Sequence, residues 1–325
     1  MSEQSSTSAQ FFLEAGMGIS EELQPQVLEH GTSYERILLP LDGSGSAERA
    51  ISVVRALSEK HGSQIVLARV VEPAPAHADA EQTEESLQLA RMYLRQVATA
   101  LGYHGIEARM VVRIGPVAQG LLAVAAEEDV SLIAMSTHGR LTPEAQPFGT
   151  VGKELLRSSA IPILAVPAHA RMVKPSQSFH TMLLPFDGVA SREEVAPLAV
   201  EFAVNFGIDL VVLVQVVEPW GTGRGEAEVR VDAEAHLAHL AHLFERKRIP
   251  TVHLIPMGDP VREILNAARD HRADLIAMST RQGASSENGG VGAVTEGVIK
   301  EADVPVLTTR PLSEPGGPPP SPTER

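Results

Sequence analysis

The chain has 325 residues, of which 43% are hydrophobic and 21% charged, and its formal net charge is −14. This charge makes nucleic acid and anionic membrane surfaces poor partners, and the absence of cysteine excludes disulfides, thiolate zinc sites and thiol nucleophiles. No apolar run approaches the roughly 20 residues of a membrane span. The first basic residue is Arg36, so the amino terminus lacks the basic region of a secretory signal. We therefore expect a cytoplasmic location.

The same pattern occurs twice in the chain. ILLPLDG at Ile37 to Gly43 returns as MLLPFDG at Met182 to Gly188, and LIAMST at 132–137 returns unchanged at 275–280. Equivalent residues stay 143 to 146 positions apart. One domain of roughly 130 residues has therefore been duplicated in tandem.

The repeat predicts five segments. They are an N-terminal extension (1–33), the first copy (34–168), a linker (169–178), the second copy (179–311) and a tail (312–325). The tail is too rich in Pro and Gly to join a helix or sheet, and we expect it to be disordered.

In each copy, short apolar runs alternate with amphipathic stretches, as in βαβ units whose sheet is covered on both faces. Ser44 and Ser46 are expected to cap the first helix. The fold class predicted is α/β, with two tandem doubly wound domains that each contain a five-stranded parallel sheet. The expected strands lie near 36–41, 65–71, 108–113, 131–136 and 162–167 in the first copy, and near 181–186, 210–217, 252–257, 274–279 and 305–309 in the second.

The repeated motifs fall at the carboxyl ends of the expected strands, where open α/β sheets bind ligands. In the first copy, MSTHG ends the fourth strand, and nine residues after Gly139 the motif Gly149-Thr150-Val151 opens a helix. Amides at a helix start form a natural phosphate site, which the Thr150 hydroxyl would strengthen. The alternative interpretation is that these are only turn residues, since Gly and Asp gather in loops for conformational reasons.

Both copies, from about Arg36 to Pro311, resemble the universal stress protein family in LPLDGS, MSTHGR, GTV and the closing IPILAVP. In ATP-binding members of that family the loop reads Gly, two residues, Gly, nine residues, Gly, then Ser or Thr. Here Ser136 replaces the first Gly, and Gly139, Gly149 and Thr150 keep the others. The resemblance implies the nucleotide-binding fold of adenine nucleotide alpha hydrolase-like (HUP-type) proteins.

The resemblance also implies a binding role for nine residues of the first copy. It implies ATP or another adenine nucleotide as ligand, with Mg²⁺ held through the phosphates and no protein metal site. The role implied is regulatory rather than enzymatic, although slow ATP hydrolysis would be compatible with it. The residues are Pro40, Asp42 and Val70 at the adenine and ribose end, Met135, Ser136 and Gly139 at the ribose and first phosphate, and Gly149, Thr150 and Val151 at the remaining phosphates.

The second copy departs from the loop pattern at two positions. Gln282 stands where the second Gly is expected, and Ala293 replaces the Ser or Thr after Gly292. Losing a hydroxyl that bonds a charged group weakens binding by roughly tenfold to a hundredfold. Because Pro185, Asp187 and Val216 are kept, an adenine half-site can persist. We expect the first copy to hold nucleotide and the second copy to be empty or to bind it weakly. The glycine-rich loop that ends at Gly292 is expected to be mobile.

Three other signals receive simpler interpretations. Histidines recur at every third position, at His236, His239 and His242, and leucines recur at the same spacing. This pattern indicates an amphipathic helix with histidines along its solvent-exposed edge rather than a metal site. GTGRGE at 221–226 lacks the Lys-Ser/Thr ending of a phosphate loop. His138 has no nucleophile or paired carboxylate beside it at a motif position, so we expect it to be a hydrogen-bonded or solvent-facing histidine rather than a base.

Two alternatives to a nucleotide-binding stress protein stay open. One is a scaffold of the same family that acts only through protein partners. The other is an enzyme of the same superfold, such as a nucleotidyl transferase or an electron-transfer flavoprotein subunit, whose characteristic residues are not evident. A homodimer and an unidentified protein partner are expected, with 163–167 and 306–309 as the strands that mediate pairing within the chain and between chains.

Overall fold

The computed structural model describes residues 34–72, 80–139, 148–171, 179–187, 195–217, 225–280 and 292–309, all of which belong to one compact unit, Ser33–Arg325. The expected N-terminal extension, the C-terminal tail, most of the linker, Gln282 and residues 221–224 and 283–291 of the two glycine-rich loops lie outside the described residues.

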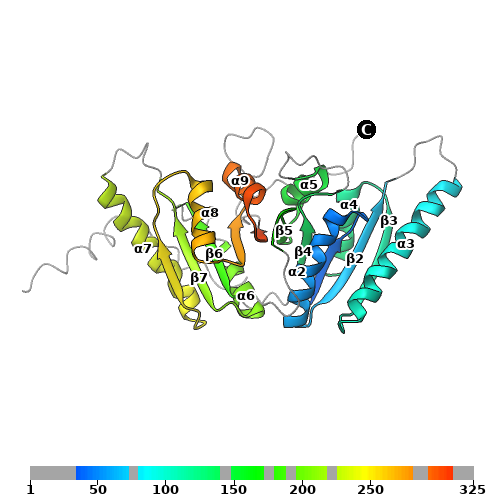
Figure 1. Ribbon diagram of the computed structural model, residues 1–325, viewed down its shortest axis with the longest axis horizontal. Helices are drawn as coiled ribbons and strands as arrows, with labels where there is room; N and C mark the ends of the chain where they lie inside the picture. The colour runs from blue at the N-terminus through cyan, green and yellow to red at the C-terminus, as the bar shows by residue number, and fades with distance from the viewer. Residues whose placement is uncertain are drawn as a thin grey trace, which may run out of the picture. The chain divides into compact units, whose positions relative to one another are not determined.

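Each copy folds as an alternation of strands and helices (Figure 1). The first copy contains β1 (Arg36–Pro40), α2 (Gly45–His61), β2 (Gln64–Val71), α3 (Ala80–Gly102), β3 (Ala108–Ile114), α4 (Val117–Glu127), β4 (Leu132–Ser136), α5 (Thr150–Ser158) and β5 (Ile163–Val166). The second contains β6 (Thr181–Phe186), α6 (Val195–Phe206), β7 (Leu210–Gln215), α7 (Glu226–Glu245), β8 (Thr251–Leu254), α8 (Pro260–Asp270), β9 (Leu275–Ser279), α9 (Ala293–Glu301) and β10 (Val306–Thr309).

Within each copy all strand pairs are parallel, in the order β3-β2-β1-β4-β5 and β8-β7-β6-β9-β10. This confirms the predicted fold class. The strand that follows β1 in the chain lies on one side of it and β4 lies on the other, so the strand order reverses at β1. The same reversal occurs at β6 in the second copy.

The two sheets join through their last strands. β5 and β10 pair antiparallel, with Leu307 opposite Leu164, and so form one ten-stranded sheet. The hydroxyl of Thr308 donates to the carbonyl of Ile163 across the same joint, at 3.1 Å. The predicted pairing of these strands within the chain is therefore confirmed. It also covers two sheet edges that would otherwise be exposed to association.

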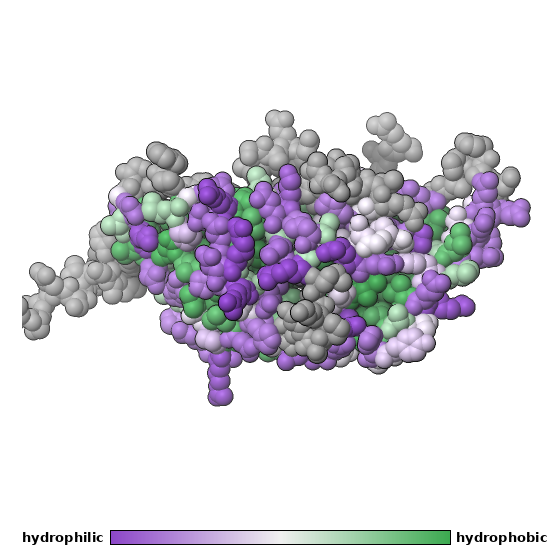
Figure 2. Space-filling view, in the orientation of Figure 1, coloured by the Kyte–Doolittle hydropathy of each residue, from purple (hydrophilic) through white to green (hydrophobic). Residues whose placement is uncertain are grey.

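Two buried apolar clusters correspond to the two faces of the sheet. α2, α3, α6 and α7 contribute to the first cluster, and α4, α5, α8 and α9 to the second. Alternate residues of the strands point to opposite faces, so that Leu39 belongs to one cluster and Leu38 to the other. Figure 2 shows hydrophilic residues over much of the visible surface of the described residues.

An aromatic cluster joins the copies on the first of these faces. Tyr34, just before β1, is fully buried, and its ring centroid lies 5.6 Å from that of Phe202 and 5.1 Å from that of Phe206, both on α6. The tyrosine hydroxyl is buried without a hydrogen-bond partner among the described residues. This connection between the copies is thus apolar.

The linker begins with two anchored residues. The guanidinium of Arg49 on α2 donates to the carbonyl of Ala170 at 2.6 Å. Arg171 pairs with Asp303 at 3.1 Å through its side chain, and its backbone N–H donates to the carbonyl of the same residue at 2.7 Å. The start of the linker therefore contacts both copies.

Two local predictions need correction. Ser44 is the N-cap of α2 and accepts from the N–H of Ala47, whereas Ser46 lies inside the helix and is not a cap. The strand expected near 252–257 ends at Leu254 because Pro256 has no N–H for the ladder, and Met257 forms only an isolated bridge with Val217.

Candidate functional site

The expected site residues lie at the carboxyl ends of β1, β2 and β4 and at the start of α5 in the first copy. The chain leaves β1 for α2, on one face of the sheet, and leaves β4 for α5, on the other face. The site is thus at the point where the strand order reverses, which is where sheets of this class bind ligands.

Asp42 is held in place by the start of α2. It follows β1 by two residues after the half-buried Pro40, and its Oδ1 accepts from the backbone N–H of Ser44 at 2.8 Å. Since Ser44 is itself the N-cap of the helix, the carboxylate is fixed by local chain geometry and is half-exposed at the head of the sheet.

Gly139 lies against Asp42, although the two residues are almost 100 positions apart in the sequence. A Cβ on Gly139 would lie 2.8 Å from Oδ2 of Asp42, which is closer than real Cβ atoms come to a neighbour. The loop after β4 can approach the carboxylate only because this residue has no side chain. The structure therefore brings the β1 end and the β4 end of the expected site together.

Met135 and Val70 belong to the apolar cluster under α4 and α5. The Cε atom of Met135 would lie 3.4 Å from a Cβ on Gly152 in the first turn of α5. Both Cγ atoms of Val70 would lie 3.0 Å from a Cβ on Gly120 of α4. The sequence analysis missed Gly120, whose only sequence signal is a glycine inside an apolar helix.

The loop between β4 and α5 is closed by a hydrogen bond between its two described ends. The N–H of Gly149 donates to the carbonyl of Thr137 at 3.1 Å, so that this amide is already engaged. Gly149 is the N-cap of α5 and provides no side-chain cap. The next two amides, of Thr150 and Val151, are the first-turn donors that a helix leaves without an intrahelical partner. Of the part of this loop that the structure describes, these two amides and the hydroxyl of the exposed Thr150 are available to an anion.

His138 and Ser136 make local hydrogen bonds in the same loop. Nδ1 of His138 lies 2.9 Å from the hydroxyl of Thr137, and the backbone N–H of His138 donates to the Ser136 hydroxyl at 3.4 Å. His138 is half-buried, and this partner agrees with the expectation of a hydrogen-bonded histidine.

A polar cluster beside Asp42 was not expected from the sequence. The Tyr93 hydroxyl on α3 donates to a carboxylate oxygen of Glu48 on α2 at 3.0 Å, and the guanidinium carbon of Arg69 lies 5.4 Å from the centre of the tyrosine ring. Burial raises the pKa of Tyr93 above its ordinary value, and the hydrogen bond to Glu48 and the negative charges of Glu48 and Asp42 raise it further. The acidic charge of Asp42 therefore acts on this cluster.

The second copy has a different pair at the equivalent positions. Nδ1 of His236 lies 2.8 Å from the amide oxygen of Gln215, and the histidine ring packs edge-on against Phe186 at 5.9 Å. His236 is thus half-buried, which corrects the prediction of a solvent-facing position, whereas His239 and His242 are exposed. No group of three or more metal-ligating side chains is found within the described residues.

The second copy also closes its loop differently. The hydroxyl of Thr295 in α9 donates to the carbonyl of Ser279 at the end of β9, at 3.1 Å. The equivalent position of the first copy is Gly152, which has no hydroxyl to make this bond. Asp187 is exposed and Val216 half-buried at the ends of β6 and β7, and Gly292 again caps its helix without a side chain.

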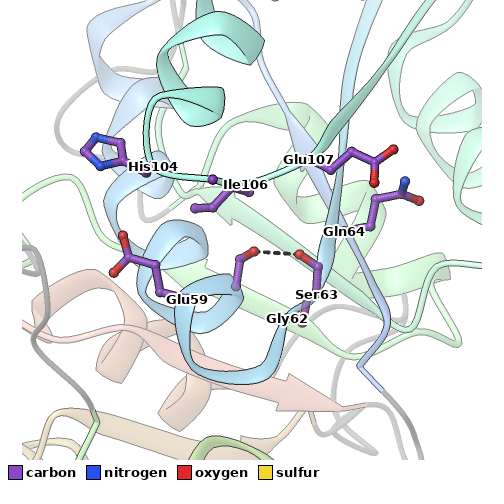
Figure 3. Close-up of a pocket in the computed structure, with 9 residues that line it drawn as sticks. Glu59, Gly62, Ser63, Gln64, His104, Ile106 and Glu107 are labelled. Carbon is purple, nitrogen blue, oxygen red and sulfur yellow. Dashed lines mark hydrogen bonds between the residues drawn. The ribbon is translucent and has the colours of Figure 1, made fainter.

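A cavity of about 490 Å³ lies at the opposite end of the first sheet, where α2 ends and β2 begins. Figure 3 shows Glu59, His104 and Glu107 among its lining residues, and the hydroxyl of Ser58 donates to the carbonyl of Ser63 beside it at 2.6 Å. None of the nine expected site residues lines this cavity. Among the described residues, no helix combines the length and the apolar character needed to cross a bilayer.

Comparisons with known proteins agree on one family. Residues 33–167 and 178–310 each match the model of the universal stress protein family. A universal stress protein of Thermus aquaticus is 27% identical over 135 residues, which are 41% of this chain and 98% of the relative. One from Synechocystis is 31% identical over 135 residues, 41% of this chain and 86% of the relative.

A solved structure shows the same fold over both copies. The crystal structure of a universal stress protein from Archaeoglobus fulgidus superposes with a TM-score of 0.65 at 22% identity, and the match covers 86% of this chain and 97% of that one. The curated relatives therefore correspond to one copy, and this structure corresponds to the tandem pair.

Proposed function

Because the chain belongs to the universal stress protein family, we propose that it binds ATP or a related adenine nucleotide in its first copy and that binding regulates a stress response. The observation that carries this proposal is the contact of Asp42 with Gly139 at the strand-order reversal of the first sheet. The hydrogen bond from Gly149 to Thr137 ties the start of α5 to the same loop. An acceptor for a sugar or base donor and a set of anion-binding amides then lie at one end of the sheet.

The proposed arrangement divides the nucleotide between the strand ends and the helix start. Pro40, Asp42 and Val70 would receive the base and ribose. Met135, Ser136 and Gly139 would flank the ribose and first phosphate. The later phosphates would meet the amides of Thr150 and Val151 and the Thr150 hydroxyl, while Gly149 keeps the loop closed by its bond to Thr137.

Magnesium would be held through the phosphates and would offset part of their charge. Binding rather than catalysis is the role proposed for these residues. Slow hydrolysis of bound ATP would not contradict it, because the proposal depends on occupancy and not on turnover.

The second copy is proposed to bind weakly or not at all. Ala293 has no hydroxyl at the position of Thr150, and Thr295 already bonds the end of β9. A homodimer and a protein partner stay predictions. The edges of β5 and β10 pair with each other inside one chain. A dimer between chains would therefore have to form through another surface.

Calorimetric titration of the full chain with Mg-ATP tests the proposal. We expect one strong site per chain, and a nucleotide released from the purified protein by denaturation would support it. Absence of binding at millimolar ATP would overturn the proposal in favour of a scaffold that acts through protein partners, and two equal sites would overturn the asymmetry between the copies.

A further inference from the structure

The two ends of the ten-stranded sheet differ in how they are protected. β8 forms one end and has only four residues, because Pro256 stands where the first copy has Arg113. β3 forms the other end beside α3 and has seven residues (Figure 1). Within the described residues no strand pairs with the outer side of β3. Since a long unpaired edge can accept another strand and a short edge beside a proline resists it, β3 is the open end of the sheet.

The unpaired backbone groups of β3 belong to alternate residues. The N–H of Ile65 donates to the carbonyl of Glu107 at 3.1 Å, and the N–H of Gly115 donates to the carbonyl of Val71 at 3.0 Å. Backbone groups of successive strand residues point to opposite sides, so the odd-numbered residues of β3 are turned toward β2. The residues turned outward are Ala108, Met110, Val112 and Ile114. Their N–H and carbonyl groups form a row with which an added strand can pair.

Exposed apolar side chains gather at the same end of the sheet. In the part of the chain that the structure describes, eight large apolar side chains are exposed, and five of them lie on α3, on the turn after it or on β3. The five are Leu89, Met92, Tyr103, Met110 and Ile114. Met110 and Ile114 are on the open strand itself, with exposed fractions of 44% and 49%. An added strand would therefore gain apolar contacts as well as hydrogen bonds.

The charged side chains of β3 leave this apolar side free. Arg109 pairs with Glu128 at 2.9 Å and Arg113 pairs with Glu127, both at the end of α4. The side chains of even-numbered residues point to the opposite face of the sheet, where Val112 packs against the cluster under α3. The two arginines are thus neutralised on the α4 face, and neither protects the edge on the α3 face.

Three features favour another molecule of the same protein as the occupant of this edge. The equivalent strands β5 and β10 already pair antiparallel inside the chain, so edges of this fold join with their own counterparts. Only one end of the sheet is open, and pairing of like ends gives a closed dimer, whereas pairing of β3 with β8 would continue into a fibre. The third feature is that β3 is complementary to itself in one register.

That register has a twofold axis at Val112. Val112 then faces itself and Met110 faces Ile114 of the other molecule, so that these outward residues exchange their backbone bonds. Arg113 faces Val111. A register centred one residue earlier would place two arginines directly opposite each other, which is destabilising. A register centred on Met110 would leave Ile114 beyond the start of the other strand.

We propose that the protein forms a homodimer in which two β3 strands pair antiparallel about a twofold axis at Val112. The dimer joins two ten-stranded sheets into one continuous sheet and covers the open end of each. It does not depend on nucleotide binding, because none of the nine residues proposed for the nucleotide site lies on β3 or α3. The dimer and the proposed function can therefore be tested separately.

Sedimentation equilibrium of the full chain tests the proposal. At micromolar concentration we expect twice the mass of one chain. Val112→Pro removes one N–H from each molecule and should weaken the dimer by roughly tenfold to a hundredfold. The fold should be kept, because this N–H points away from β2 and edge strands accept proline at such a position. His253→Pro is the matched control, since it removes an outward N–H from β8, and it should leave the dimer unchanged.

Charged substitutions provide a second measurement that leaves the backbone unchanged. Met110→Lys and Ile114→Lys each bring two ammonium groups into the interface and should give monomers, while the circular dichroism spectrum stays that of the wild type. Val231→Lys is the control, because Val231 is 67% exposed on α7 near the other end of the sheet, and it should stay dimeric. A wild type that is monomeric throughout the micromolar range would overturn the proposal, and so would dimers that persist in both Val112→Pro and Met110→Lys.

Disulfide formation tests the register, since the chain has no cysteine of its own. Residues of a hydrogen-bonded antiparallel pair lie about 5.5 Å apart, which a disulfide can span. The double variant Met110→Cys with Ile114→Cys should therefore oxidise to a covalent dimer. Its two cysteines lie about 13 Å apart within one strand and cannot join each other. Each single variant should stay non-covalent, and single variants that cross-link as well as the double variant would show that the register is wrong.

Discussion

The carboxylate of Asp42 lies directly against the backbone of Gly139: a Cβ on Gly139 would be 2.8 Å from Oδ2 of Asp42. The other carboxylate oxygen accepts from the N–H of Ser44, at the start of α2. One side chain therefore contacts the loops that follow β1 and β4, and the position of each loop depends on it.

Gly139→Ala should displace the Asp42 carboxylate and lower ATP affinity by at least about tenfold, because the added methyl would lie 2.8 Å from an oxygen that is proposed to bond the nucleotide. The fold should be kept, since the obstacle is the end of a side chain and not backbone. Gly45→Ala is the matched control, because a Cβ at Gly45 meets nothing within 4 Å. Calorimetry should find the control close to wild type, and equal affinities for both variants would contradict the assigned role of Asp42.

Thr150→Ala should reduce ATP affinity by roughly tenfold to a hundredfold, because a hydroxyl bonded to a charged group contributes about 1.5–3 kcal/mol. Thr150→Ser keeps the hydroxyl and should keep most of the affinity. Thr150 is exposed and α5 has no side-chain cap, so that neither variant should change the melting temperature without ligand. Unchanged ATP affinity in Thr150→Ala would remove the hydroxyl from the proposed site.

Tyr34→Phe should stabilise the protein by about 1 kcal/mol, because it removes a buried hydroxyl that has no partner among the described residues while the ring contacts remain. Phe206→Ala should instead destabilise by about 3–5 kcal/mol, through the cavity left between the copies. Denaturant unfolding measures both. A clear loss of stability in Tyr34→Phe would indicate that the hydroxyl has a partner.

Stability should fall as the pH rises above the ordinary tyrosine pKa of 10.0. Burial, and then the charge of Glu201, raise the pKa of Tyr34 in the folded protein. The unfolded chain therefore loses the Tyr34 proton first, and this contribution, fully present below pH 10, is lost as the pH increases. Tyr93 acts in the same direction. Melting curves from pH 8 to 11 should show a smaller alkaline loss for Tyr34→Phe than for wild type.

Local patterns predicted the elements well. Apolar runs placed all ten strands of the described residues within a few positions. The inner strands are buried on both faces, which requires an apolar side chain at nearly every residue. The errors were local. Pro256 shortened β8, and of the two serines expected as caps Ser44 precedes α2 whereas Ser46 lies inside it.

The sequence predicted which residues form the candidate site but not the contacts among them. Glycine and threonine spacing identified Gly139, Gly149 and Thr150, yet no spacing indicates that the amide of Gly149 is engaged by Thr137. The Tyr93, Glu48 and Arg69 cluster was missed because its members come from three separate elements and form no motif along the chain.

The sequence by itself determined the duplication, the doubly wound class of each copy and the two departures of the second copy from the loop pattern, since these depend on residue identity and on periodicity along the chain. Only the tertiary structure decided that Asp42 meets Gly139, that Tyr34 packs against both Phe202 and Phe206, and which groups remain available to an anion at α5. Such contacts join segments that are distant in the chain, and their distances depend on how the strands and helices pack rather than on any local preference.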